Sequence, residues 1–192
     1  MKKKVAHFVS LIGNPLVLSV LVAVYANFKI FDWQQALTLT MILAGVGVVP
    51  VFWFINRRVQ QGRYADHDVS ARKKRPDLYR FSLVVLALMI GILYWTGQPK
   101  PILNGALAAW VLAAVSFGVN FRLKTSLHTG YAFLIGFLSL SVGFWLGMGL
   151  IAFAFLVGWS RIALGRHTLQ EVFTGASLGS IIGCAFHQYM FF

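Results

Sequence analysis

The stretch SRIALGRHTLQEV, residues 160–172, combines side chains that could carry out nucleophilic or acid–base chemistry. Glu171, the only glutamate in the chain, follows His167 by four positions, and residues four apart share one face of a helix. A carboxylate bonded to one imidazole nitrogen fixes the tautomer and makes the other nitrogen more basic, as a histidine nucleophile or base requires. A plainer interpretation is a His–Glu pair that stabilises a helix start, where glutamate suits the positive end of the dipole. The spacing alone leaves both interpretations open.

This pair lies between strongly apolar segments of a chain that is poor in charge. Of its 192 residues 58% are hydrophobic and 11% are charged, whereas roughly a quarter are charged in a soluble domain. The composition predicts an all-α fold, a polytopic transmembrane helix bundle that forms one integral membrane domain over residues 1–192 of a cell-membrane protein. The net charge of +12 would favour nucleic acid as partner of a soluble protein. In a membrane protein, basic loops set orientation and attract anionic headgroups, so we expect membrane lipids and no nucleic acid as partners.

Seven apolar segments mark the expected spans, near residues 8–27, 35–55, 81–97, 101–121, 130–145, 147–160 and 169–191. A helix needs about 20 apolar residues to cross the hydrocarbon core, so we expect about seven spans, or six if the fifth and sixth segments are misread. Gly147 and Gly149 are expected to form the tight turn between those two segments, and TGQPKP at 96–101 another turn. The first segment also resembles a signal peptide, but its length favours an uncleaved span.

Almost all basic residues fall on one side of this topology. With seven spans, every one of the 17 lysines and arginines except Lys29 and Lys100 lies on the side of the N-terminus. The positive-inside rule places that side in the cytoplasm. The lysines at positions 2–4 support this orientation independently of any arginine that binds a substrate.

The three loops on that side also hold most of the ionisable side chains that could form a site. Each loop carries one histidine, namely His67, His128 or His167. Ionisable residues at a membrane boundary mark functional sites more often than those in ordinary soluble loops. Asp66, His67 and Asp68 could cap a helix, support a phosphate site or serve only solvation, and we assign them no catalytic role.

Short motifs in these loops form a pattern in three parts. SRIALGRHTLQE at 160–171 resembles the third signature of the type 2 phosphatidic acid phosphatase (PAP2) superfamily, S-R-x5-H-x3-D. SLH at 126–128 resembles the end of the second signature, P-S-G-H, and RP at 75–76 the end of the first, K-x6-R-P. The order matches and the resemblance covers roughly residues 56–180. It implies a PAP2-like core with a catalytic region over 56–192.

The first two signatures are degenerate in this chain. Thr125 and Leu127 stand where proline and glycine are expected. Asp68 occupies the position of the first-signature lysine, and the nearby cations that could replace that lysine are Arg72 and Lys74.

The resemblance implies a role for each matching residue. His167 would attack phosphorus and form a phosphohistidine, with Glu171, in place of the usual aspartate, orienting its ring. His128 would protonate the leaving lipid oxygen and then activate the water that releases phosphate. The phosphoryl oxygens would be bound by Arg75, Arg161 and Ser126.

The expected activity is that of a membrane lipid phosphatase, which hydrolyses a phosphomonoester or diphosphate of a phosphatidate-like or polyprenyl lipid. Phosphoryl transfer depends mainly on positioning and electrostatic stabilisation, and guanidinium groups match phosphate geometry. The resembled family needs no metal or other cofactor, so none is expected. Because a histidine must be neutral to attack, activity is expected to fall below about pH 6.5.

An alternative is a catalytically inactive PAP2-like protein that binds anionic lipid or a partner through its basic face. A small transporter or channel is disfavoured, because the span interiors hold few ionisable residues. The sequence distinguishes neither the lipid chain, nor mono- from diphosphate, nor the oligomeric state.

Overall fold

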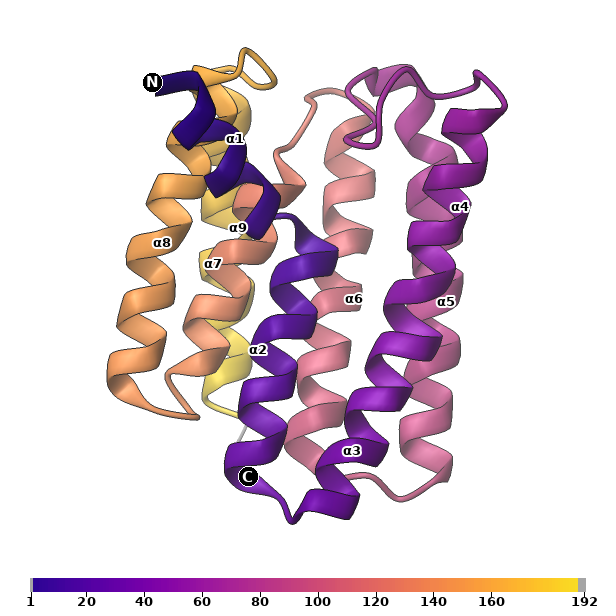
Figure 1. Ribbon diagram of the computed structural model, residues 1–192, viewed down its shortest axis with the longest axis vertical. Helices are drawn as coiled ribbons and strands as arrows, with labels where there is room; N and C mark the ends of the chain where they lie inside the picture. The colour runs from indigo at the N-terminus through magenta and orange to yellow at the C-terminus, as the bar shows by residue number, and fades with distance from the viewer. Residues whose placement is uncertain (1, 190–192) are drawn as a thin grey trace.

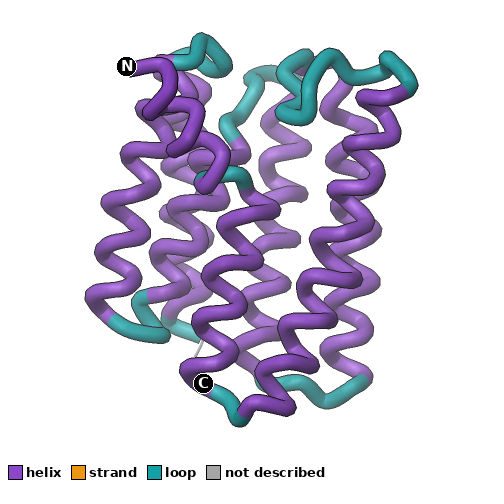
Figure 2. Tube along the Cα trace, viewed as in Figure 1, coloured by secondary structure: helices purple, strands orange, loops and turns teal. Residues whose placement is uncertain are grey.

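A computed structural model describes residues 2–189 as a helix bundle with short connections at its two ends (Figure 1, Figure 2). Within this range there is no strand, which confirms the all-α prediction. The elements are α1 (Lys2–Ile12), α2 (Pro15–Ile30), α3 (Trp33–Ile42), the π-helix η1 (Leu43–Val48), α4 (Val49–Gln60), the 3-10 turn η2 (Arg72–Lys74), α5 (Arg75–Trp95), α6 (Lys100–Asn120), α7 (Leu127–Ser139), α8 (Phe144–Ala163) and α9 (Leu169–His187).

Five helical stretches are long and apolar enough to cross a membrane: Trp33–Gln60, Arg72–Trp95, Lys100–Asn120, Phe144–Ala163 and Leu169–His187. The number becomes six if α1 and α2, which meet at an angle of 58°, are counted as one bent span. Helix α7 has 13 residues and falls short of the required length. For residues 2–189 the expected count of about seven spans is therefore not confirmed, whereas a multi-pass architecture is compatible with the helices.

The turn between α7 and α8 lies earlier than the sequence pattern predicts. It occupies residues 140–143, so Gly147 and Gly149 lie inside α8 and form no turn. A Cβ atom on Gly147 would lie 2.7 Å from the backbone nitrogen of Leu140. This glycine therefore lets α8 pass close to the end of α7. The sequence alone does not distinguish a glycine with this role from one that forms a turn. The other expected turn, at 96–101, does join α5 to α6 through Gly97, whose φ is +64°.

The helical stretch that begins with α3 changes its hydrogen-bond pattern at η1. There the amide of Val49 donates to the carbonyl of Ala44, five residues back. Pro50 follows directly; it has no amide hydrogen and its ring crowds the carbonyl of Val46, so the regular pattern cannot form. The proline thus accounts for the wider turn.

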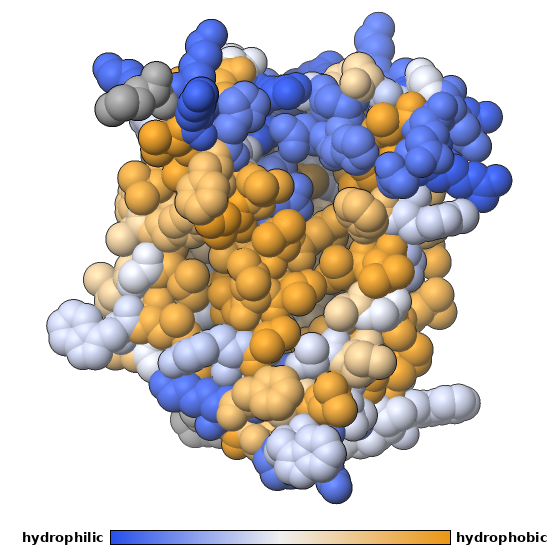
Figure 3. Space-filling view, in the orientation of Figure 1, coloured by the Kyte–Doolittle hydropathy of each residue, from blue (hydrophilic) through white to orange (hydrophobic). Residues whose placement is uncertain are grey.

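The polar connections gather at one end of the bundle, at the top of Figure 1, together with the start of α1. They are the α4–α5, α6–α7 and α8–α9 loops, and their surface is hydrophilic in Figure 3, whereas the middle of the bundle is covered by apolar side chains. Lys29 and Lys100 lie at the opposite end, at the end of α2 and the start of α6. All three loops with a candidate histidine thus meet at one end.

Glycines bring α9 into direct contact with α7. They recur at every fourth position, as Gly175, Gly179 and Gly183. A Cβ on Gly175 would collide with the carbonyl oxygen of Ser126, and one on Gly179 with that of Gly130. Small residues at this spacing allow helix backbones in membranes to approach closely. The contact holds the start of α7 against the start of α9.

Candidate active site

His167 lies in the loop just before α9, and Glu171 lies in the first turn of that helix. Thr168 caps the helix in a capping box: its side chain accepts from the Glu171 amide, and Glu171 Oε2 accepts from the Thr168 amide at 3.3 Å. The same Oε2 lies 2.8 Å from His167 Nδ1. Both interpretations of the pair therefore describe the structure, since one carboxylate caps the helix and orients the ring. The contact arises because the loop folds back, not because both residues lie on one helical face.

The imidazole of His167 is set up to remain neutral. The residue is 7% exposed. Burial lowers the pKa of His167 to about 2, with further lowering by the charges of Arg75, Lys124 and Arg161. With Nδ1–H donating to Glu171, Nε2 carries the lone pair. An ordinary histidine becomes protonated below about pH 6.5, whereas the buried ring of His167 stays neutral to a lower pH.

Lys124 is a cation beside this pair that the sequence reasoning used only to assign topology. Its Nζ donates to the Arg166 carbonyl at 2.7 Å and lies 3.8 Å from Glu171 Oε2. Burial lowers the pKa of Lys124. Arg72, expected as a substitute for the missing lysine, instead donates to a carbonyl of the α6–α7 loop, and Lys74 is exposed. The position of Lys124 two residues before Ser126 was the sequence feature that could have predicted a cation beside the His167–Glu171 pair.

Ser126 and His128 begin α7. Ser126 is the N-cap residue and is fully buried; its Oγ lies 3.0 Å from Thr129 Oγ1, and its amide donates to the Glu171 carbonyl at 3.1 Å. The expected phosphate ligand Ser126 thus has its hydroxyl engaged at the helix start. His128 is buried, and its Nε2 lies 3.6 Å from Asp68 Oδ1.

Arg161, at the end of α8, is 1% exposed and has one buried donor left over. One terminal nitrogen donates to Asp68 Oδ2 at 2.9 Å and the other to Ser10 Oγ in α1. Its Nε has no hydrogen-bond partner among the described residues. A buried donor without a partner is costly, so an oxygen from a bound anion would be favourable here.

Arg75, the first residue of α5, joins two of the loops. It is 3% exposed, and it donates through Nε to the Val69 carbonyl at 3.0 Å and through a terminal nitrogen to the Thr125 carbonyl at 2.6 Å. These bonds occupy two of its five N–H groups. After burial, the charge of Arg75 is the next cause that lowers the pKa of His167.

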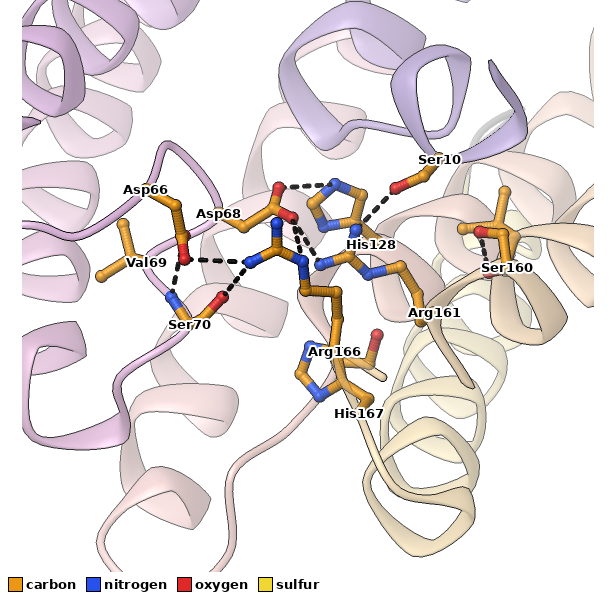
Figure 4. Close-up of polar contacts among 12 residues, drawn as sticks. Ser10, Asp66, Asp68, Val69, Ser70, His128, Ser160, Arg161, Arg166 and His167 are labelled. Carbon is orange, nitrogen blue, oxygen red and sulfur yellow. Dashed lines mark hydrogen bonds and ion pairs between the residues drawn. The ribbon is translucent and has the colours of Figure 1, made fainter. Parts of the chain in front are cut away.

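Asp68 brings a carboxylate among the groups expected to bind phosphate (Figure 4). It pairs with Arg161 at 2.9 Å, with His128 at 3.6 Å and with Arg166 at 3.9 Å. Burial alone would raise the pKa of Asp68, but the charges of His128, Arg161 and Arg166 outweigh it and lower that pKa. The residue that departs most from the first signature therefore lies in the site as an anion.

A strained turn directs the loop that carries Asp68. Val69 has φ +47°, a left-handed conformation that is a genuine outlier for a β-branched residue and costs on the order of 1–3 kcal/mol. Packing holds the turn, because Val69 is buried and its carbonyl accepts from Arg75. The Asp66 carboxylate accepts from the Ser70 amide at 3.2 Å and from Arg166 at 3.0 Å.

Comparison with known proteins gave no match: no protein-family model, curated protein or solved structure matches this chain. The geometry is therefore the basis for any functional proposal. Around the His167–Glu171 pair it places His128 and three buried or half-buried cations, Arg75, Lys124 and Arg161.

Proposed function

We propose that this protein is a membrane lipid phosphatase that transfers the phosphoryl group of a lipid phosphate to His167 and then to water. The observation that carries the proposal is a buried, neutral imidazole with a carboxylate on Nδ1 and cations around it, at the polar end of an apolar bundle. A neutral nucleophile in a positive field suits attack on a phosphate ester.

In the first step, Nε2 of His167 attacks phosphorus and the bond from phosphorus to the lipid oxygen breaks. Glu171 stabilises the positive charge that develops on the ring, and Arg161, Arg75 and Lys124 stabilise the charge on the phosphoryl oxygens. His128 gives its proton to the leaving oxygen. In the second step, His128 takes a proton from water, the water oxygen bonds to phosphorus, and the bond to His167 breaks.

Asp68 has two effects in this scheme. Burial and the charge of Arg161 lower the pKa of His128. The Asp68 carboxylate opposes that shift and favours the protonated imidazole, which is the form that a general acid needs. The same carboxylate neutralises Arg161, so an incoming phosphate competes with it for the guanidinium. Substrate binding is therefore coupled to movement of Asp68 away from Arg161.

Phosphate release from lipid phosphates by the purified protein in detergent tests the proposal. His167→Ala is expected to abolish release, and Glu171→Gln to weaken it. The matched control is His187→Ala, which removes a histidine bonded to Ser141 at the opposite end of α9. Equal turnover by wild type and His167→Ala would overturn the assignment of the nucleophile.

One observation favours a second candidate, a catalytically inactive protein that binds anionic lipid. The pairing of Asp68 with Arg161 and His128 fills the positions of a phosphate anchor and a general acid with internal contacts. If this candidate holds, the wild type releases no phosphate from any lipid phosphate, yet sediments with vesicles of anionic lipid.

We further propose that the site faces the cytoplasm from the cell membrane, because the basic loops lie at its end of the bundle. In a chain with Cys184→Ser, Gln61→Cys lies at the site end and Gln34→Cys at the other; both glutamines are exposed. An impermeant thiol reagent added to intact cells is expected to label Gln34→Cys alone. Labelling of Gln61→Cys alone would reverse the orientation.

A further inference from the structure

The interior of the bundle contains a cavity of about 330 Å³ between α2, α3–η1, α5, α6 and α7. Its polar end is lined by Asp68, Arg75 and His128, which belong to the candidate site. Arg75 and Met89, both on α5, line it as well, so it extends about 20 Å along that helix at 1.5 Å per residue. In Figure 3, apolar side chains surround a hollow below the polar end.

A polar pair lines the cavity far from the candidate site. Asn27 Nδ2 donates to Thr40 Oγ1 at 3.2 Å, and both residues line the cavity. Asn27 is 1% exposed, and its Oδ1 has no hydrogen-bond partner within the described part of the chain. Between the two polar ends the wall is predominantly apolar, with Leu86, Met89 and Ala106 among its residues.

We propose that this cavity holds the hydrocarbon chain of a single-chain lipid phosphate whose headgroup lies against Arg75 and His128. The inference rests on the proposed function for the identity of the headgroup. The Arg75 guanidinium and the His128 imidazole at one end match a phosphate, and the apolar wall that continues from them matches a chain. Ligand pockets run from about 300 to 1,000 Å³, and this cavity of about 330 Å³ lies at the lower limit, which favours one chain over two.

The cavity selects chains by shape and length. Hydrocarbon gains little on moving from lipid tails into an apolar cavity, so burial as such gives little preference over the bilayer. A chain longer than the distance from Arg75 to Asn27 and Thr40 does not fit between the two polar ends, which disfavours longer chains. The π-helix packs closely against α5 at this wall, because a Cβ on Gly47 would lie 2.7 Å from Met89 Sδ.

Photocrosslinking of the full chain with hexadecyl phosphate that carries a diazirine at its chain end tests the location. A hexadecyl chain has an extended length comparable to the cavity. Crosslinks are expected on lining residues far from the candidate site, such as Asn27 and Ile102. Crosslinks confined to exposed residues on the outer face of α5, such as Val84 and Leu88, would overturn the proposal.

Gly105→Leu tests the same cavity through turnover. Gly105 lines the cavity, and a Cβ there would meet no atom within 4 Å apart from its chain neighbours and the adjacent backbone of α6. The variant therefore fills part of the cavity without a clash at Cβ. Hydrolysis of hexadecyl phosphate is expected to fall by about tenfold or more, the scale of a misfit in an apolar pocket, while octyl phosphate is unaffected. The control is Gly118→Leu, on the exposed face of α6, which should change neither rate.

The two proposals fail in different ways. If the wild type hydrolyses neither ester but hexadecyl phosphate crosslinks near Asn27, the cavity assignment stands and the phosphatase assignment falls. The opposite result has three parts: both esters are hydrolysed, the crosslinks lie outside the cavity, and Gly105→Leu slows both hydrolyses equally or not at all. In that case the phosphatase assignment stands and the cavity assignment falls.

Discussion

The two regions that form the site are built differently. Helices α7 and α9 meet backbone to backbone at glycines, and this contact fixes Ser126 against the first turn of α9. The α4–α5 loop reaches the same site through side chains and one strained residue, Val69, and it delivers Asp68. The first arrangement permits little adjustment, whereas ion pairs can exchange one anion for another. We infer that the nucleophile is held rigidly and that the counter-charge is the part that moves.

The largest effect is expected at the glycine contact. In Gly179→Ala the new Cβ collides with the Gly130 carbonyl, a backbone atom that cannot rotate away. The expected cost is on the order of 3 kcal/mol, at the upper end for overpacking, with loss of phosphate release. Thermal unfolding in detergent measures it, against Gly118→Ala on an exposed face. An unchanged unfolding midpoint in Gly179→Ala would show that the α7–α9 contact is not rigid.

Asp68→Asn separates the two roles of the mobile carboxylate. Phosphate binding is expected to tighten by about tenfold, equivalent to 1.4 kcal/mol, because Arg161 loses its competing anion. The kcat is expected to fall by as much as about a hundredfold, the lower range for general acid–base catalysis, because His128 loses its partner.

Orthovanadate inhibition and kcat report these two effects separately. Asp66→Asn is the matched control, since Asp66 pairs with Arg166 and not with Arg161 or His128. An unchanged vanadate affinity in Asp68→Asn would show that the carboxylate does not compete with phosphate.

The pH dependence of turnover tests the charge state of the His167 imidazole. Because burial and neighbouring cations lower the pKa of His167 to about 2, the neutral nucleophile persists when the pH falls through 6.5. After correction for ionisation of the substrate, whose second pKa is about 6, kcat/KM is expected to decline only at more acidic pH. A limb at about pH 6.5, where a free histidine titrates, would contradict the buried environment.

The smallest effect is expected at the strained turn. Val69→Gly should be more stable than Val69→Ala, although glycine is smaller, because only glycine adopts a φ of +47° without cost. The expected difference is about 1 kcal/mol, measured from the two unfolding midpoints. The opposite order would mean that packing, and not backbone conformation, dominates at this position.

The sequence predicted the helical architecture, because hydropathy acts over a few residues. It also predicted the proximity of Glu171 to His167, although the contact forms through a loop that folds back onto the first turn of α9 and not through helical spacing. It misplaced the α7–α8 turn, since a glycine that permits close packing looks the same as one that permits a turn. The spacing of Gly175, Gly179 and Gly183 was a signal for the α7–α9 contact that the sequence reasoning did not use.

The positions of Asp68 and Lys124 were beyond local patterns. Each belongs to a different loop from its partners, and the geometry depends on an outlier backbone conformation at Val69 and on long-range bonds from Arg75. In the sequence, Asp68 occupies the position where the first signature has a lysine. Its contact with Arg161 joins residues 93 positions apart, which local patterns do not predict.

Trapping of the covalent intermediate tests the central claim most directly. Wild-type protein, mixed with a radiolabelled lipid phosphate and quenched rapidly in alkali, is expected to carry an acid-labile, alkali-stable label on His167. The label should be reduced in Glu171→Gln and present in His187→Ala. Turnover by the wild type with no label on His167, or an equal label in His167→Ala, would contradict the account.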